Sequence, residues 1–162
     1  MKPIWIVDDD QSIRFVLEKA LARSNLPTRS FASPREVNNA LLTAADDELP
    51  RVMISDIRMP GGSGLDLLAK VKERFPGLPV IVMTAYSDLD SAVSAFQGGA
   101  FEYLPKPFDV PKAVELVQRA VAESERELTH DPGFARYATR VVFESARAVL
   151  PLVPLALGWA WF

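Results

Sequence analysis

Five runs of mostly apolar residues recur along the first 110 positions of the chain. Continuous runs such as Ile4-Trp5-Ile6-Val7 and the run ending at Thr84 are typical of parallel strands buried on both faces. The run from Thr28 to Phe31 is the weakest, because polar residues interrupt it. The pattern predicts strands over residues 4–7, 28–31, 51–55, 79–84 and 101–104.

Between these runs, apolar residues recur every three or four positions, which predicts helices with one buried face. Asp10 or Ser12 is expected to cap the first helix, Ser33-Pro34 with Glu36 to begin the second, and Asp88 to cap the fourth. The expected inward residues of the five helices are Ile13, Val16, Leu17, Ala20 and Leu21; Val37, Ala40 and Leu41; Leu65, Leu68 and Val71; Ala92, Val93 and Phe96; and Val110, Val114, Val117 and Val121.

The alternation of strands and helices predicts the fold class. Five strands alternating with five helices favour an α/β domain: a five-stranded parallel sheet with helices on both faces and right-handed crossovers. Residues 1–125 suffice for such a domain, and residues 126–162 form a separate C-terminal extension.

Composition narrows the possible chemistry. The 162 residues include no cysteine and a single histidine, His130, which excludes thiolate chemistry, cysteine zinc sites and a histidine metal site. A formal net charge of −3 gives no electrostatic case for nucleic acid binding. The N-terminal apolar run meets Asp8 too early for a secretory signal, so we expect a cytoplasmic protein.

Charged and polar residues follow several of the predicted strands. Asp8-Asp9-Asp10 follows the first, Asp56 the third, Thr84 ends the fourth and Lys106 follows the fifth. All strands of a parallel sheet point the same way, so these residues meet at one edge, where ligands bind in open α/β sheets. Clustered carboxylates repel by roughly 1–4 kcal/mol per close pair, so a cation or a raised pKa must relieve them. Oxygen ligands on a shallow rim favour Mg²⁺.

This set of side chains suits phosphoryl transfer. A metal beside Asp56 would screen its charge and allow a carboxylate oxygen to attack an electrophilic phosphoryl group. Mg²⁺, Lys106 and Thr84 would hold the phosphoryl oxygens. No histidine or arginine is placed to drive full turnover, so the acyl phosphate would persist and serve as a signal.

Four motifs carry a family resemblance. They are Val7-Asp8-Asp9-Asp10, Asp56-Ile57-Arg58-Met59-Pro60-Gly61, Met83-Thr84-Ala85 and Lys106-Pro107-Phe108. In order and spacing, roughly residues 3–125 resemble the receiver domain of two-component response regulators, a flavodoxin-like fold. Residues 55–60, 85–93 and 99–109 are most similar to the NtrC class of nitrogen-regulation response regulators.

The resemblance implies a role for each matching residue. Asp56 would accept a phosphoryl group from the phosphohistidine of a sensor histidine kinase, and Asp8, Asp9, Asp56 and the backbone carbonyl of Arg58 would hold Mg²⁺. Thr84 and Lys106 would contact the phosphoryl group. Tyr103 matches an aromatic position that reports activation, Lys106-Pro107 matches a bond that is usually cis, and Gly62-Ser63-Gly64 fits a flexible turn.

The resemblance also implies a switch and leaves rival functions open. Phosphorylation would draw Thr84 inward, let Tyr103 follow, change the surface of the helix after Asp88, and favour a homodimer. A Mg²⁺-dependent phosphatase with an aspartyl nucleophile is one alternative, although Arg58 stands where such enzymes carry a second acid. A binding module that is never phosphorylated is the other. We expect a phosphoacceptor with slow self-dephosphorylation at most, not an enzyme.

The C-terminal extension does not match the family. The ATPase and DNA-binding domains of NtrC-class regulators are not found in this chain, so we expect no direct nucleic acid binding. Residues 149–162 carry no charge but are short for a membrane span and contain Pro151 and Pro154, so we do not expect membrane association. Such an apolar tail would fold back, pair with a second copy, or reflect a replaced end.

Overall fold

The structure is a computed structural model that describes residues 1–85 and 87–130, with side chains described through residue 126. The chain divides into two units, Met1–Glu125 and Arg126–Phe162, and the fold described below is that of the first. The expectations for the tail at 149–162 lie outside the described residues. Among the described helices, none is long and apolar enough to cross a membrane.

The first unit contains a five-stranded parallel sheet, which confirms the predicted fold class. The strand order is β2-β1-β3-β6-β7, so β1, β3 and β6 are central. The five strands are β1 (Ile4–Val7), β2 (Thr28–Phe31), β3 (Val52–Asp56), β6 (Val80–Ala85) and β7 (Glu102–Lys106). β1 and β3 are buried along their whole length, as their unbroken apolar runs predict.

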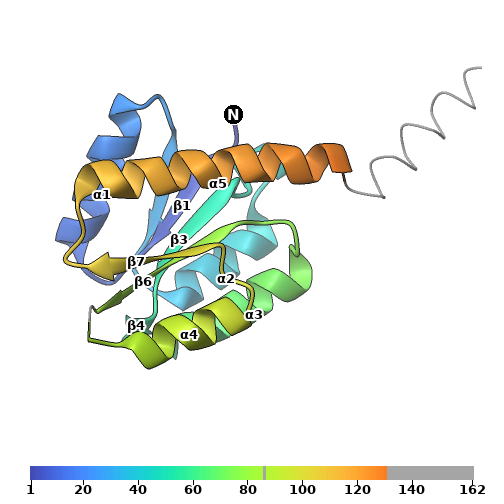
Figure 1. The fold of residues 1–162 in the computed structure, drawn as a ribbon. Coiled ribbons are helices and arrows are strands. Elements are labelled where there is room, and N and C mark those ends of the chain that lie inside the picture. Colours follow the sequence, from blue (N-terminus) through green and yellow to red (C-terminus); the bar gives the residue numbers. More distant parts are fainter. Residues whose placement is uncertain (86, 131–162) are drawn as a thin grey trace, which may run out of the picture. The chain divides into compact units, whose positions relative to one another are not determined.

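Five helices cover the two faces of this sheet (Figure 1). α1 and α5 pack on one face, where Leu17, Leu21 and Val117 meet Ile4 and Ile54 in one core cluster. α2, α3 and α4 lie on the other face, where a second cluster surrounds the fully buried Trp5. The helices are α1 (Gln11–Arg23), α2 (Pro34–Thr43), α3 (Gly64–Arg74), α4 (Leu89–Gln97) and α5 (Val110–His130).

The predicted helix starts are confirmed. Asp10 caps α1 by accepting from the Ser12 N–H, which settles the choice between the two candidates. Ser33 caps α2 with Pro34 at the first position. Asp88 caps α4 by accepting from the Ser91 N–H.

Several predicted inward faces are rotated in the structure. Val16, Val93 and Phe96 are 40%, 47% and 44% exposed, although each was expected to be buried. On α4 the buried residues are the small Ala92 and Ala95, which let this short helix approach the sheet closely. On α5 the buried residues are Ala113, Leu116, Val117 and Ala120, while Val110, Val114 and Val121 are only half-buried; on α1 and α3, Ile13 and Leu65 are also half-buried.

Two strand ends differ from the prediction. β7 continues through Pro105 to Lys106, where a loop was expected. Proline is tolerated there because β7 is an edge strand and needs no second set of ladder hydrogen bonds. β3 likewise includes Asp56 itself. The Lys106–Pro107 peptide is cis, as the resemblance implied.

The structure also contains short elements that the sequence pattern did not indicate. A 3₁₀ turn, η1 (Asp46–Glu48), precedes β3. β4 (Arg58–Met59) and β5 (Gly62–Ser63) form an antiparallel hairpin directly after the phosphoacceptor candidate. The segment 62–64, expected to be a turn, therefore supplies a short strand and the first residue of α3.

Candidate functional site

The carboxyl ends of the strands bring the predicted polar residues together at one edge of the sheet. Register pairs Asp56 of β3 with Met83 of β6, and Ala85 of β6 with Lys106 of β7. Asp8 directly follows Val7, the last residue of β1, and Val7 pairs with Ser55, the residue before Asp56 on β3. Residues that lie about 50 and 100 positions apart in the chain thus become neighbours.

The ammonium group of Lys106 links two of the carboxylates. Lys106 Nζ lies 2.6 Å from Asp8 Oδ2 and 3.1 Å from Asp56 Oδ2, so it donates to both. Charge-assisted hydrogen bonds of this kind are stronger than neutral ones. These two contacts show that Lys106 is not a freely solvated loop lysine.

Burial raises the free-energy cost of keeping the side chains of this cluster charged. Asp8 is fully buried and Asp56 is 8% exposed. Burial raises the pKa of Asp8, and the hydrogen bonds from Lys106 and from the Asp10 N–H only partly offset this. Burial by itself would lower the pKa of Lys106, but its bonds to Asp8 and the charges of both carboxylates outweigh that effect and raise it. The cluster thus holds Lys106 in its charged form.

The third carboxylate completes a set of oxygen donors. One oxygen each of Asp8, Asp9 and Asp56 lies within 4.8 Å of the others. Asp9 is exposed and Asp8 and Asp56 are buried, so the set opens toward solvent on one side. Carboxylate oxygens with room for water are the donors that Mg²⁺ prefers, and the residues present fit that ion.

Of the two residues expected to form the switch, Thr84 lies close to Asp56 in the sheet, whereas Tyr103 lies outside the acidic cluster. Thr84 is 3% exposed near the end of β6, one residue beyond the partner of Asp56. Tyr103 pairs with Val82 in the ladder and is not part of the acidic cluster. Its ring packs edge-to-face on Phe96 of α4, with 5.8 Å between ring centroids. The structure therefore connects Tyr103 to α4.

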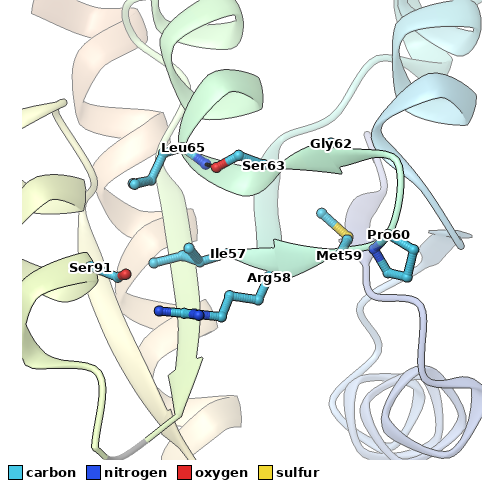
Figure 2. A pocket seen from close by; sticks show the side chains of 8 residues that line it. All are labelled: Ile57, Arg58, Met59, Pro60, Gly62, Ser63, Leu65 and Ser91. Atoms are coloured by element: carbon cyan, nitrogen blue, oxygen red, sulfur yellow. Dashed lines mark hydrogen bonds between the residues drawn. The ribbon is translucent and has the colours of Figure 1, made fainter.

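Arg58 contributes more than the backbone carbonyl that the sequence analysis singled out. Its backbone N–H donates to Asp56 Oδ1 over 3.3 Å, and its side chain forms an ion pair with Asp88, the N-cap of α4. A cavity of about 600 Å³ lies between the β4–β5 hairpin and α4, and Figure 2 shows Arg58 extending across it toward Ser91. The side-chain role had no signal in the sequence, because Arg58 and Asp88 are 30 residues apart.

A sequence comparison decides the family. The pattern of the response regulator receiver domain matches residues 4–118, which is most of the chain. The chain belongs to the response regulator receiver domain family. The family resemblance seen in the sequence is therefore confirmed. Receiver domains of this family are signalling domains that take phosphate from sensor histidine kinases, and they generally bind Mg²⁺ at an acidic pocket.

Individual relatives narrow the class. The receiver is 55% identical over 124 residues to the DNA-binding transcriptional regulator NtrC of Salmonella typhimurium, covering 76% of this chain and 26% of that protein. It is 39% identical over 127 residues to the response regulator protein PilR of Pseudomonas aeruginosa, covering 78% and 28%. The chain thus spans about a quarter of the length of these relatives.

A solved structure gives the same result. The solution structure of the apo receiver domain of nitrogen regulatory protein C matches with a TM-score of 0.65 and 56% identity, over 75% of this chain and 94% of that one. A receiver domain from Clostridium thermocellum matches with a TM-score of 0.70 at 28% identity, covering 77% and 98%. The first unit is therefore an NtrC-like receiver domain.

Proposed function

We propose that this receiver takes a phosphoryl group on Asp56 from the phosphohistidine of a sensor histidine kinase. The observation that carries the proposal is the position of Lys106 Nζ, 2.6 Å from Asp8 and 3.1 Å from Asp56. An ammonium held between the acceptor and a second acid is placed to neutralise phosphoryl oxygens as charge develops on them.

The transfer needs one nucleophile and one leaving group. A carboxylate oxygen of Asp56 attacks phosphorus, a P–O bond forms, and the P–N bond to the kinase imidazole breaks with its electron pair returning to the ring nitrogen. Lys106 and the Thr84 hydroxyl are proposed to hold two of the phosphoryl oxygens. Asp56 attacks as a carboxylate, and the Lys106 ammonium lies 3.1 Å from its Oδ2, beside the position that the phosphoryl group would take.

Asp8, Asp9, Asp56 and the carbonyl of Arg58 would hold Mg²⁺. When bound, the ion offsets the negative charge that the carboxylates and the incoming phosphoryl group bring together. Two pieces of support come from this chain: the oxygens of Asp8, Asp9 and Asp56 lie within 4.8 Å of one another, and Asp9 is open to solvent.

The phosphatase alternative is disfavoured by the surroundings of Arg58. Phosphatases with an aspartyl nucleophile use an acid two residues later to protonate the leaving group. Here the Arg58 side chain pairs with Asp88, and the hydrogen bond to that carboxylate raises the pKa of the guanidinium, so it releases no proton. Slow self-dephosphorylation is therefore the only turnover that we propose.

We propose nitrogen-linked transcription regulation as the setting, supported by the relatives named DNA-binding transcriptional regulator NtrC. A receiver that serves a DNA-binding regulator works in the bacterial cytoplasm.

The phosphoryl group adds about −1.5 to −2 charge units, and Thr84 and Tyr103 are proposed to relay that change to α4 and to favour a homodimer. The contact of Tyr103 with Phe96 supports this route. We also propose that the receiver domain ends near residue 125 and that residues 126–162 form a separate extension.

Labelling with acetyl phosphate tests the acceptor directly. The wild-type chain with Mg²⁺ is expected to gain a phosphate that hydroxylamine releases, as an acyl phosphate does. Asp56→Asn is expected to gain none. Asp10→Asn is the matched control, because it removes one charge from the same acidic edge while asparagine still caps α1. Equal labelling of Asp56→Asn and wild type would show that the acceptor is wrong.

A further inference from the structure

Arg14 on α1 contacts the backbone of the acidic site. Its Nη1 donates to the carbonyl oxygen of Asp8 over 2.6 Å, six residues back along the chain. Arg14 is half-buried and is the fourth residue of α1. The contact reaches from the helix back to the point where β1 ends.

Asp8 has a partner for each of its hydrogen-bonding groups, and Arg14 supplies one of them. Its N–H donates to Phe31 O over 3.1 Å, its Oδ1 accepts from the Asp10 N–H over 2.9 Å, and its Oδ2 accepts from Lys106 over 2.6 Å. The carbonyl is the remaining group, and only Arg14 is seen to donate to it within the described part of the chain. Asp8 is fully buried, so leaving that carbonyl unsatisfied would be costly.

The orientation of this carbonyl bears on Asp9. The Asp8 carbonyl and the Asp9 N–H belong to one planar peptide, so a bond that fixes the first also fixes the backbone that carries the Asp9 side chain. Asp9 is exposed, and among the described groups, whose side chains run through residue 126, none donates to its carboxylate. The direction of Asp9 therefore depends on the peptides that flank it. Arg14 holds the one before it, and the hydrogen bond from the Asp10 backbone N–H to Asp8 Oδ1 holds the one after it.

The position of Arg14 runs against a local preference. Near the N-terminus of a helix the macrodipole favours acidic side chains, and the first turn of α1 contains none. Arg14 forms no ion pair with a carboxylate among the described residues. Its contact is the Asp8 carbonyl. Local rules are typically broken at functional sites.

We propose that Arg14 is a positioning residue of the phosphorylation site. It holds the Asp8–Asp9 peptide in the orientation that turns the Asp9 carboxylate toward the ion shared with Asp8 and Asp56. This inference rests on the proposed function, because it assigns Arg14 a task only if the acidic cluster binds a divalent cation. Outer-shell groups of this kind commonly change metal affinity by 10–100-fold.

The test is Mg²⁺ affinity, measured by calorimetry on the full chain, together with thermal unfolding in EDTA. Arg14→Met and Arg14→Gln each remove the guanidinium, and both are expected to bind Mg²⁺ about tenfold more weakly. Arg14→Lys retains a donor and is expected to recover most of the affinity. Arg23→Met is the matched control, because it removes the same charge from the exposed end of the same helix.

The outcomes separate this inference from the proposed function. Weaker Mg²⁺ binding by whichever of Arg14→Met and Arg14→Gln folds, with rescue by Arg14→Lys, supports it. A packing role alone would lower the unfolding temperature in EDTA and leave the Mg²⁺ affinity at that of Arg23→Met, which overturns the inference and leaves the phosphoacceptor standing. A wild-type chain that binds no Mg²⁺ and takes no label overturns both.

Discussion

Arg58 Nε lies 2.8 Å from Asp88 Oδ2, and this ion pair joins β4, which follows Asp56, to the N-cap of α4. The two ends of Arg58 face different elements. The backbone N–H of Arg58 donates to Asp56 Oδ1 over 3.3 Å. At the other end, Asp88 Oδ1 accepts from the Ser91 N–H over 3.3 Å. One residue thus contacts both the Asp56 carboxylate and the cap of α4.

The cap of α4 is expected to depend more on Asp88 than on Arg58. Asp88→Ala removes both the cap and the ion pair, so amide hydrogen exchange in the first turn of α4 should accelerate several-fold. Asp88→Asn keeps a capping side chain and should accelerate it less, as should Arg58→Ala. Equal exchange in Asp88→Ala and wild type would contradict the capping role.

The pH dependence of that cap follows from the charge on Asp88. The hydrogen bond with Arg58 holds the pKa of Asp88 below its usual range. A carboxyl whose folded pKa is lowered contributes stability that is present above its unfolded pKa and is lost as the pH falls through the folded value. Protection of α4 amides should therefore persist at neutral pH and decline below about pH 4.

Asp8→Asn is expected to stabilise the metal-free protein while weakening Mg²⁺ binding. Burial raises the pKa of Asp8, so its ionised form lowers stability at neutral pH, and a neutral amide removes that cost. The melting temperature in EDTA should rise by a few degrees and the Mg²⁺ affinity should fall about tenfold. The stability gain should be largest at neutral pH and disappear below about pH 4, where Asp8 is protonated in both states. Calorimetry across this pH range checks both effects, and a lower melting temperature at pH 7 would contradict the first.

Lys106→Met is expected to move Mg²⁺ binding and phosphorylation in opposite directions. Removing an ammonium that sits 2.6 Å from Asp8 takes a positive charge away from the ion, so Mg²⁺ should bind about tenfold more tightly. Labelling of Asp56 by acetyl phosphate should slow, because no side chain replaces the proposed contact of Lys106 with the phosphoryl group. Tighter binding with unchanged labelling would show that Lys106 serves only to balance charge.

The wild-type lysine should remain charged throughout the useful pH range. Because its folded pKa is raised, its contribution to stability is present below the unfolded value near 10.4 and is lost only as the pH rises through the higher folded value. Labelling rates between pH 7 and about pH 10 should show no step that depends on Lys106.

Gly64→Ala is expected to disturb the site through the backbone. A Cβ at this position would lie 2.1 Å from the Asp56 carbonyl oxygen and 2.7 Å from Ile57 Cα, so the loop must shift. We expect a loss of about 1–3 kcal/mol in the free energy of unfolding, with slower labelling. Gly77→Ala is the control, since a Cβ there meets nothing within 4 Å. Urea unfolding of both variants gives the comparison.

Much of the site could be predicted from strand ends alone. Parallel strands share one direction, so Asp8, Asp56 and Lys106 had to meet once the strands were located. Helix rotation was less predictable. Val93 and Phe96 fit the apolar stripe of α4 as well as Ala92 does, and only the close approach of the helix to the sheet turned the alanines inward.

By itself, the sequence determined the order of elements, the parallel sheet and the acids, hydroxyl and lysine at its carboxyl edge, because buried strands and capped helices are encoded by short-range patterns. Only the tertiary structure decided which of those groups touch: Lys106 with Asp8 and Asp56, Arg58 with Asp88, and Arg14 with the Asp8 carbonyl. The contacts of long side chains depend on burial and on the charges around them in three dimensions, and spacing along the chain does not encode those contacts.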